Sequence, residues 1–528
     1  MTDYDWLVIG SGFGGSVSAL RLAEKGYRVA IVECGRRFED ADFAQETKDA
    51  RNYYWAPQIG LRGILRLTLF KDIFIASGCG VGGGSLGYAN TLYRAMPGFY
   101  ANPQWNGLAD WEAELAPHYE EAERMLGVAE YDRDGDADLL LKEYGEAIGV
   151  GDTYHRARVG VFLGEPGRRV ADPYFGGEGP ERTGCLRCGA CMVGCRHGAK
   201  NTLRKNYLWF AERLGVTILP ERSVTDIRPL GGGDGSEGYE VTHQRSGALI
   251  RRDLRSIRAH GVVLAAGALG TNRLLQRCKL GGSLPRLSER LGYVVRTNSE
   301  SIMSVSAPES DTRNFAKSIA ITSSIHTDAD THIEVVTYGE GGDTQSLLFN
   351  MLVQAGKRGT QPLHFLAAVA RRPHEAVQAF KIKGTSRRTI ILLVMQTLDN
   401  SIRLRVKRRL PNGNVALTTE QDPLNPNPTN VPAAYDAARW FAQRMDGTAF
   451  SGVTEAMLAI PTTAHILGGA VIGDSPATGV IDSQHRVFGY ENLLVCDGSA
   501  VPANVGANPS LTITALAERA MTFIPAAA

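Results

Sequence analysis

A short apolar run, a glycine-rich turn and a helical pattern open the chain and constrain its fold more than any other feature. Asp5–Ile9 has the composition of a buried strand, and Gly10-Ser-Gly12-Phe-Gly14-Gly15 follows it directly. Apolar residues at helical spacing then continue from Val17 to Ala23. This order of strand, glycine turn and helix is typical of the unit that places a dinucleotide pyrophosphate at a helix N-terminus.

Each glycine of this fingerprint has a separate predicted role. Gly10 makes the turn, Gly12 lets the backbone approach a pyrophosphate, and Gly15 lets the helix pack closely against the strand. The next strand, Arg28 to Val32, ends in Glu33, where a carboxylate would accept hydrogen bonds from a ribose. An acid at this position disfavours NADP. The motif alone leaves FAD and NAD open, and a tight structural turn without a ligand is the alternative.

Later segments repeat the combination of a buried strand and glycine. The run Gly78–Leu86 is too dense in glycine for a helix or a strand interior, which indicates that another group approaches its backbone closely. Gly261–Leu275 predicts a buried strand that leads through a glycine turn into a helix. Asn492–Ser499 predicts a strand that ends in an acid and a glycine, and Pro509 suits the first position of a closing helix.

Length and charge narrow the classes of partner. With 528 residues the chain is long enough for two or three structural units. A formal net charge of +1 gives no global field that favours nucleic acid, so we expect no nucleic-acid partner. The N-terminal apolar run is too short for a signal peptide, and no window of about eighteen apolar residues predicts a transmembrane helix. We therefore expect a cytoplasmic protein, in which reducing conditions disfavour disulfides.

Four of the eight cysteines lie close together, at Cys185, Cys188, Cys191 and Cys195. Their CxxCxxCxxxC spacing is that of bacterial ferredoxins, in which thiolates hold an iron–sulfur cluster. Arg196 stands where the ferredoxin pattern has proline, and no second run supplies another cluster. A cluster on all four thiolates and a three-iron cluster therefore both stay open. The alternatives are a reduced structural loop and a zinc site, which the missing spacer between cysteine pairs disfavours.

Together these segments resemble the glucose–methanol–choline (GMC) family of flavin oxidoreductases over the whole chain, and within it the actinobacterial cholesterol oxidase-like branch. The residues that carry the resemblance are GVGGGSLGYANTL from Gly80, GAKNTL from Gly198, IILLVMQTLDN from Ile390, AHILGGAVIGDSPATGVIDSQHRVFGYENLLVCDGSA from Ala464 and NPSLTITALAERA from Asn508. Such long matches are more specific than the glycine fingerprint alone.

The resemblance implies FAD as the cofactor, bound non-covalently because the second glycine cluster holds no histidine for a covalent link. The adenine half would lie at Gly10–Gly15 and Glu33. The closing helix after Pro509 would direct its positive end at the flavin pyrimidine. The other residues that the resemblance places at the cofactor are Gly82, Gly83, Gly84, Ser85 and Asn90 along the flavin, and Asp497 and Gly498 near its ribityl chain and pyrophosphate.

The same resemblance assigns catalytic residues. His465 matches the family histidine, and histidine suits proton transfer near neutral pH. Asn508 matches the asparagine that positions the substrate hydroxyl, with helix capping as a compatible role. Relatives that oxidise steroids also use a glutamate to move a proton and shift a double bond. Glu334 lies on the apolar phase of a strand-like stretch and is the candidate for that role, with a solvated or paired acid as the alternative.

We therefore expect an α/β protein with a Rossmann-type FAD-binding domain built from discontinuous segments. Alternating patterns over 301–353 and 388–418 add an α+β substrate domain with a mainly antiparallel sheet. The expected boundaries are 1–95, 202–300 and 462–528 for the FAD-binding domain, 96–201 for the cysteine-rich loop and cover segments, and 301–461 for the substrate-binding domain.

Two stretches combine apolar and basic residues, 61–71 and 363–372. One interpretation is that they pack on the core as amphipathic helices. The other is peripheral contact with a membrane, through which a lipid-like substrate would enter.

The predicted activity is FAD-dependent oxidation of a secondary alcohol on a hydrophobic, steroid-like molecule to a ketone, by hydride transfer to the flavin. Oxygen or an electron-acceptor protein would take the electrons. One alternative is an FAD and iron–sulfur dehydrogenase of another alcohol or sugar that passes electrons to a protein or quinone. The other alternative is a flavin-binding electron carrier without its own substrate.

Overall fold

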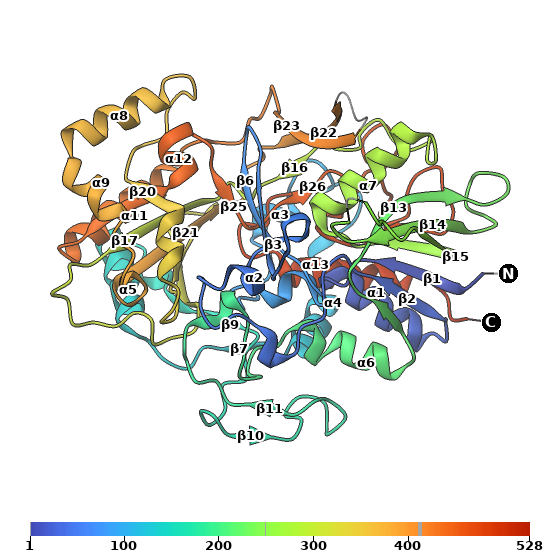
Figure 1. The fold of residues 1–528 in the computed structure, drawn as a ribbon, viewed down its shortest axis with the longest axis horizontal. Helices are drawn as coiled ribbons and strands as arrows, with labels where there is room; N and C mark the ends of the chain where they lie inside the picture. The colour runs from blue at the N-terminus through green and yellow to red at the C-terminus, as the bar shows by residue number, and fades with distance from the viewer. Residues whose placement is uncertain (1, 249, 410–413, 528) are drawn as a thin grey trace.

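The computed structural model describes residues 2–248, 250–409 and 414–527. One of its two large sheets lies beside both chain termini (Figure 1). Its central strands run parallel and are buried on both faces, which their continuous apolar sequences allow. Two antiparallel strands extend one side. The spatial order is β12 (Thr217–Leu219), β2 (Val29–Val32), β1 (Tyr4–Ile9), β15 (Arg255–Leu264), β14 (Tyr239–Arg245) and β13 (Arg222–Pro229), with β27 (Leu493–Val495) beside β15.

Helix α1 (Phe13–Glu24) follows β1 through the first glycine turn and packs against α13 (Ser510–Thr522) and α6 (Tyr207–Arg213). The turn requires glycine at Gly10 and Gly14, as it does at Gly15. Gly10 has a φ of 105°, and a Cβ on Gly14 would lie 1.6 Å from the carbonyl oxygen of Cys496. The close approach of α1 to the end of β27 therefore depends on a glycine to which the fingerprint assigned no separate role.

The second large sheet is antiparallel and lies at the other end of the molecule (Figure 1). Helices α5 (Asp136–Ala147) and α11 (Pro432–Arg444) cover one of its faces, and the opposite face turns toward the first sheet. Its strands, in spatial order, are β20 (Phe349–Met351), β24 (Thr448–Gly452), β17 (Ser301–Ser306), β21 (Thr389–Gln396), β19 (Thr331–Val336), β18 (Ile321–His326) and β8 (His155–Arg156).

Strand β19 shows how the alternation of side chains divides the two faces. Ile333 and Val335 belong to the core formed with α5 and α11, whereas Val336 belongs to the core shared with the first sheet. Because successive side chains of a strand point to opposite faces, Glu334 lies on the same face as Val336. The alternation thus directs a fully buried glutamate toward the first sheet.

Smaller sheets join the two large ones. One contains β23 (Asn414–Gln421), β22 (Ile402–Arg409), β16 (Val295–Arg296) and β26 (Leu467–Gly468), and another contains β25 (Thr462–Thr463), β6 (Phe74–Gly78) and β5 (Leu65–Leu69). The stretch 61–71 therefore contains two strands, β4 (Leu61–Arg62) and β5, and the expectation of an amphipathic helix there is wrong. Its apolar residues alternate with a period close to two at Leu65, Leu67 and Leu69, and pairing with β6 uses that pattern.

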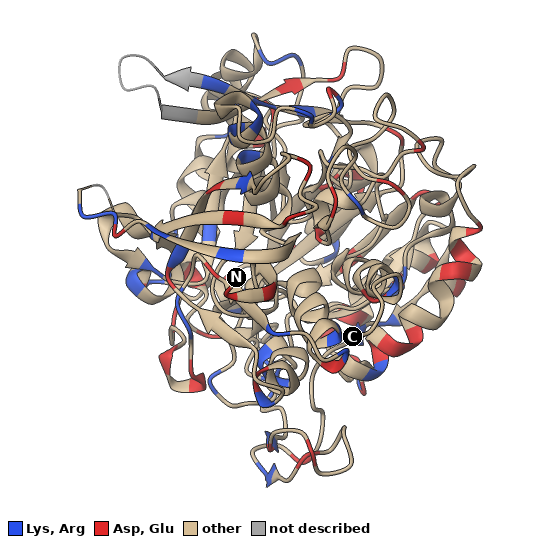
Figure 2. Cartoon of the chain, turned by 90° about the vertical axis from the view of Figure 1, so that its right-hand side faces the viewer, with Lys and Arg blue, Asp and Glu red and all other residues tan. Residues whose placement is uncertain are grey.

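The predicted fold class is confirmed, because a doubly covered parallel sheet and a mainly antiparallel second sheet are both present. The residue boundaries of the domains stay a prediction. Basic and acidic residues are interspersed along the chain on the face shown in Figure 2. Among the described residues, none of the helices combines the length and the apolar character needed to cross a lipid bilayer.

Candidate active site

A cavity of about 1060 Å³ lies between the two large sheets, at the carboxyl ends of β1, β2, β15 and β27. This edge of a parallel sheet is where nucleotides bind in such folds. Ten of the residues predicted from the sequence line the cavity. They are Gly10, Gly12, Glu33, Gly83, Gly84, His465, Asp497, Gly498, Asn508 and Pro509.

The dinucleotide end of the cavity is formed by the first glycine turn. Gly12 has an ordinary φ of −72°, and a Cβ built on it would meet no atom closer than Gly83 Cα at 3.9 Å. Its role is therefore to leave the cavity open. Gly15 does not line the cavity. A Cβ on Gly15 would lie 2.1 Å from the Gly10 carbonyl oxygen, so glycine at this position lets the helix pack closely against the turn. The predicted division of roles between these two glycines matches this geometry.

Glu33 ends β2, as expected for an acid that faces a ribose. Its carboxylate accepts hydrogen bonds from the Ser11 amide at 3.0 Å, the Ser11 hydroxyl at 2.8 Å and the Gly35 amide at 2.8 Å. These contacts fix the carboxylate at the cavity wall while each oxygen keeps lone pairs for a further donor.

The second glycine cluster contains both cavity walls and internal supports. Gly83 and Gly84 line the cavity. Gly82 and Ser85 do not, because the Ser85 hydroxyl donates to the Gly82 carbonyl at 2.7 Å and accepts from the Leu203 amide at 3.0 Å. Asn90 is fully buried, and its chain neighbours Ala89 and Thr91 line the cavity. Neither the oxygen nor the nitrogen of its side-chain amide has a hydrogen-bond partner. An unsatisfied buried amide beside an open cavity fits a polar cofactor such as FAD.

Asp497 ends β27 and holds the turn below the cavity. It accepts from the Gly267 amide at 2.9 Å, the Thr271 hydroxyl at 2.6 Å and the Ser499 amide at 2.8 Å. Burial raises the pKa of its carboxyl above the ordinary value. Pro509 precedes α13 as its N-cap, one position earlier than expected, and the N-terminus of that helix faces the cavity through Ser510. The positive end of the helix dipole is therefore available to a group that gains negative charge.

His465 lies between β25 and β26, paired with a carboxylate that sequence analysis did not identify. Its Nδ1 is 3.2 Å from Oε2 of Glu300, a side chain with no exposed area. Glu300 is held by the Thr463 hydroxyl at 2.7 Å and the Ala464 amide at 3.1 Å. Burial acts to lower the pKa of His465, but the charge and hydrogen bonding of Glu300, with a smaller effect from Glu334, raise it above its ordinary value.

Glu334 and Asn508 form the other half of the site. The Asn508 side-chain nitrogen donates to Oε2 of Glu334 at 3.3 Å. Burial raises the pKa of Glu334 to about 8, against the opposing effects of Asn508 and His465. Oε1 of Glu334 and Oδ1 of Asn508 are both buried without a partner. The structure thus brings the three predicted catalytic residues together and leaves polar atoms free to meet a bound molecule.

Two residues that the sequence prediction missed support this arrangement. Glu300 lies in Asn-Ser-Glu-Ser immediately before β17, where no motif marks it. Asn298 has a positive φ of 62°, donates to the Ala507 carbonyl at 2.9 Å and accepts from the Gly506 amide at 2.9 Å. It therefore fixes the loop that carries Asn508. Asparagine in Asn-Ser followed by a strand is a common signal for a left-handed turn, but it does not reveal which loop the side chain holds.

The cysteine loop lies against the second glycine cluster. Lys200 donates to the carbonyls of Leu86 at 2.9 Å, Tyr88 at 2.8 Å and Cys191 at 2.8 Å, and Met192 lines the cavity. All eight cysteines are free thiols. No three of the loop cysteines bring their sulfur atoms within 4.8 Å of one another in the described part of the chain, as the ligands of one zinc ion would. An iron–sulfur cluster holds its thiolates farther apart than a single zinc ion does, so the separation of the sulfur atoms does not test the predicted iron–sulfur cluster.

Burial also determines the protonation of the loop. It raises the pKa of Cys185 to about 12 and that of Cys191 to about 11, and it lowers the pKa of Lys200 to about 7. Neutral thiols follow at physiological pH. Binding of iron would have to supply the free energy for deprotonating them.

Comparisons with known proteins agree with this site. A family description of FAD dependent oxidoreductases matches residues 5–338, and the C-terminal description of GMC oxidoreductases matches 411–517. The chain belongs to the GMC family of FAD-dependent oxidoreductases, which confirms the predicted family, the predicted enzyme class acting on CH–OH groups and FAD as the cofactor.

The relatives include proteins named for one activity. The cholesterol oxidase of Mycobacterium tuberculosis strain H37Rv is 47% identical over 99% of this chain and 91% of its own length. The cholesterol oxidase of Acinetobacter baumannii is 45% identical over 99% of this chain and 95% of its own. Among solved structures, pyridoxine 4-oxidase from Mesorbium loti has a TM-score of 0.60 at 15% identity, covering 98% of this chain and 99% of that one, which shows the shared fold.

Proposed function

We propose that this enzyme oxidises a secondary alcohol on a hydrophobic, steroid-like molecule to a ketone. The observation that carries the proposal is that Glu300, His465 and Asn508 line a largely apolar chamber, while Glu334 accepts a hydrogen bond from Asn508 without itself lining the chamber. The relatives named as cholesterol oxidases support the steroid class. The apolar residues that line the chamber include Ile302, Ile321, Val336, Leu348, Ile391 and Leu393.

His465 would receive the hydroxyl proton of the alcohol. When bound, FAD supplies the acceptor for the carbon-bound hydride. Loss of the hydroxyl proton requires a base with a pKa near the working pH, which suits His465 in its neutral form. The buried Glu300 carboxylate would stabilise the imidazolium that results, because an opposite charge at 3.2 Å interacts strongly when it is screened little by solvent. Asn508 would hold the substrate oxygen through the second N–H of its side-chain amide, since the other N–H donates to Glu334.

Glu334 would carry a proton within the chamber. Its pKa of about 8 lies close to neutral pH, so the carboxylate form is accessible there to take a proton from the carbon beside the ketone, and the acid formed can return that proton at the far carbon of the double bond. Its unpartnered Oε1 is the atom available for this transfer. This supports the proposal that Glu334 shifts a double bond next to the new ketone, as the steroid class would require.

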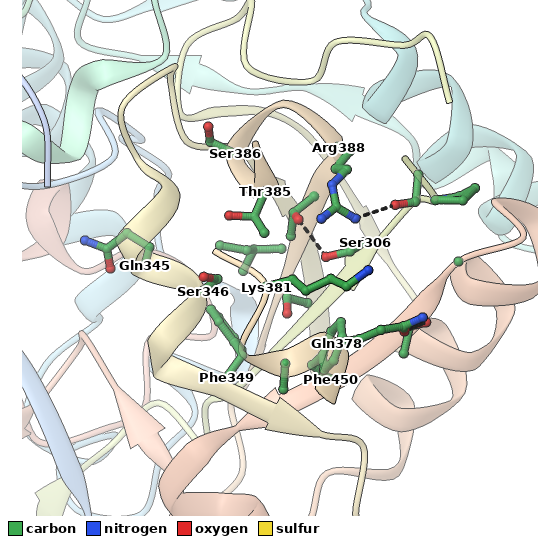
Figure 3. A pocket seen from close by; sticks show the side chains of 18 of the residues that line it. Ser306, Gln345, Ser346, Phe349, Gln378, Lys381, Thr385, Ser386, Arg388 and Phe450 are labelled. Atoms are coloured by element: carbon green, nitrogen blue, oxygen red, sulfur yellow. Dashed lines mark hydrogen bonds between the residues drawn. The ribbon is translucent and has the colours of Figure 1, made fainter. Parts of the chain in front are cut away.

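A smaller cavity of about 250 Å³ continues the chamber away from His465. The two share Tyr338, Gln345, Phe349 and Ile391 in their walls. Figure 3 shows Gln345 and Phe349 in this wall. Near them lie Ser306 of the antiparallel sheet, Gln378 of α9 (Pro373–Ala379) and Lys381 of the loop that follows α9. We propose that this space receives the end of the substrate remote from the hydroxyl.

Contact with a membrane would deliver such a substrate. Helix α8 (Gln361–Arg371) packs on the core through Phe365 and Val369, as the core-packing interpretation of 363–372 expects. Its other side, together with α9, exposes large apolar side chains between basic residues, as interfacial helices do. We define the α8–α9 apolar patch as Leu363, Leu366, Val377 and Phe380, which are 66%, 61%, 63% and 69% exposed.

Oxygen is the proposed acceptor of the electrons, in keeping with the oxidase names of the relatives. The alternative is an iron–sulfur cluster on Cys185, Cys188, Cys191 and Cys195 that passes electrons to an acceptor protein. Lys200 donates to the carbonyls of both Leu86 and Cys191 and so connects the cysteine loop to the second glycine cluster, which favours this alternative. An absorption spectrum recorded without oxygen, before and after reduction, distinguishes the two through the broad band that a cluster adds.

Turnover with matched alcohols tests the proposed function. The enzyme with bound FAD should consume oxygen with cholesterol, and much more slowly with a straight-chain alcohol or glucose. Equal rates with glucose would contradict a steroid-type substrate. Reduction of an artificial acceptor without oxygen consumption would instead support the dehydrogenase.

A further inference from the structure

Three histidines gather on the antiparallel sheet, outside the His465 site. His155 lies in β8, His326 ends β18 and His332 lies in β19. His326 and His332 stand directly opposite each other in the ladder, and His155 pairs with Ser324, two residues before His326. All three side chains therefore share one face. One ring nitrogen from each lies within 4.8 Å of the others, which is the spacing of ligands around a single metal ion.

The hydrogen bonding of His155 resembles that of a metal ligand. Its Nδ1 is 2.9 Å from the Thr153 carbonyl, and a carbonyl can only accept, so Nδ1 carries the proton. The lone pair is then on Nε2, which is 2.9 Å from the Ser324 hydroxyl. Histidines that bind metals commonly donate their second N–H to a carbonyl in this way, which fixes the ring and its tautomer.

His332 supplies the second, independent observation. The side chain is 1% exposed; one ring nitrogen has at most a weak interaction with the Gly506 backbone, and the other has no hydrogen-bond partner. A buried polar group without a partner costs free energy, so such groups in native proteins are normally satisfied by protein, water or an ion. Tyr93 packs edge-on against His332 and His155, at 5.2 and 5.6 Å between ring centroids.

Ring stacking explains part of this arrangement and leaves the rest unexplained. The three rings lie within 14° of parallel, with centroids 4.6 to 6.2 Å apart. A stack of this kind needs only flat rings, and a phenylalanine at position 332 would provide one without an unsatisfied nitrogen. The sequence instead places a second and a third imidazole at the positions that face it.

We propose that His155, His326 and His332 bind a divalent transition-metal ion, with zinc as the best match. Three neutral imidazoles are the ligand type that zinc accepts, and a fourth position is open for water or the Ser324 hydroxyl. Rotation about χ2 of the rings, a soft torsion, is the adjustment that coordination requires.

The ion would join separate parts of the chain. β8 comes from the cover segment, whereas β18 and β19 belong to the substrate-side sheet, and they are linked here by a short ladder of two residue pairs. His332 precedes Glu334 by two residues and lies on the same face of β19. A bound ion would therefore anchor the edge of the sheet that positions Glu334.

Metal content tests the site. The full chain with FAD would be dialysed against Zn²⁺ and then against metal-free buffer, and zinc would be measured per chain in wild type, His326→Gln and His332→Leu. The control is His374→Gln, an exposed histidine on α9. Wild type and the control should retain about one more zinc per chain than the two cluster variants. Because all four proteins keep the cysteine loop, zinc bound there cancels in the comparison.

Thermal unfolding gives a second readout. Zn²⁺ should raise the midpoint of wild type and His374→Gln and leave that of His326→Gln unchanged, since an ion that binds only the native state stabilises it. His326 is only partly buried, so its substitution by glutamine is compatible with folding, which FAD absorbance would check. Equal zinc content and equal midpoint shifts in all four proteins would overturn the proposal.

Discussion

Glu300 and His465 form the most consequential pair in the site, because the buried carboxylate sets the proton affinity of the imidazole. In Glu300→Gln the shape is kept and the charge is lost. The pKa of His465 should then fall, and the acidic limb of kcat/KM, where the base becomes protonated, should move to lower pH by about one unit. A pH–rate profile with saturating FAD measures this. An unchanged limb would show that His465 is not the group that titrates.

Glu334 is predicted to act after alcohol oxidation. In Glu334→Gln the flavin should still be reduced by cholesterol at nearly the wild-type rate, whereas the shift of the double bond should slow by about 100-fold or more, the usual size of a general acid–base contribution. The conjugated ketone has its own ultraviolet absorption, which separates the two steps. Equal loss of both steps would assign Glu334 to the oxidation itself.

Sequence and structure agree at the residue level where a long motif surrounds the residue. His465, Asn508 and the glycines were predicted because each lies in a family motif; His465, Asn508 and most of these glycines line the cavity, whereas Gly15 and Gly82 do not. Glu300 and the three clustered histidines were not predicted. Their significance arises from partners more than 100 residues away in the chain, as His465 and Glu300 are, and no local pattern records such a contact.

The first glycine turn allows a matched pair of substitutions. In Gly12→Ala the new Cβ has room, with Gly83 Cα at 3.9 Å, but it projects where the cofactor approaches. This variant should fold and bind FAD at least tenfold more weakly, a loss of about 1.4 kcal/mol. In Gly14→Ala the Cβ would overlap the Cys496 carbonyl, and α1 could not approach β27, so soluble protein should be strongly reduced. Titration of the apoprotein with FAD measures the first effect. Full FAD affinity in Gly12→Ala would contradict the assignment.

Helix α12 (Val453–Leu458) carries a buried acid that links stability to pH. Glu455 accepts from Tyr435 at 2.6 Å, and burial raises its pKa to about 7. Because the folded pKa is above the unfolded one, this group favours the folded state at low pH, and the contribution is lost as pH rises through about 7. Glu455→Gln should lose less stability than wild type between pH 5 and pH 8, by about 3 kcal/mol at most.

Thermal midpoints at the two pH values check this prediction. Glu289→Gln is the control, because that side chain is 94% exposed. If wild type and Glu455→Gln changed equally with pH, the buried carboxyl would not be the source of the dependence.

At the level of elements, the sequence was informative where the period of apolar residues was clear. The βαβ unit and the strands of the second sheet follow directly from such patterns. The stretch 61–71 was misjudged because apolar residues there alternate over too few positions to distinguish a short strand from a helix turn. Helix α8 has apolar residues on both sides, so its pattern could not say which side packs on the core.

For the whole molecule, the α8–α9 apolar patch lies at the end opposite the chain termini (Figure 1). Leu366→Ser combined with Phe380→Ser should weaken sedimentation with anionic lipid vesicles several-fold, because apolar area that would enter the interface is lost. Leu424→Ser is the control, an 85% exposed leucine elsewhere on the surface. Turnover of a water-soluble steroid alcohol should stay unchanged. Equal sedimentation of all three proteins would remove membrane contact from the proposal.

The presence of a Rossmann-type sheet and of a second, mainly antiparallel sheet could be predicted, because each is marked by its own pattern of apolar residues. Their exact assembly could not, since β27 joins β15 across more than 200 residues, and the cavity exists only once both sheets are in place. The chemistry therefore depends on the whole molecule: the carboxyl ends of the parallel strands supply the cofactor site, and one face of the antiparallel sheet supplies Glu334.

Anaerobic stopped-flow reduction of the flavin by cholesterol tests the central claim most directly, with wild type and His465→Ala compared at equal FAD occupancy. If His465 takes the hydroxyl proton, the reduction rate in the variant should fall by at least about 100-fold while FAD remains bound. A rate equal to that of wild type would contradict the role of the Glu300–His465 pair and with it the proposed oxidation.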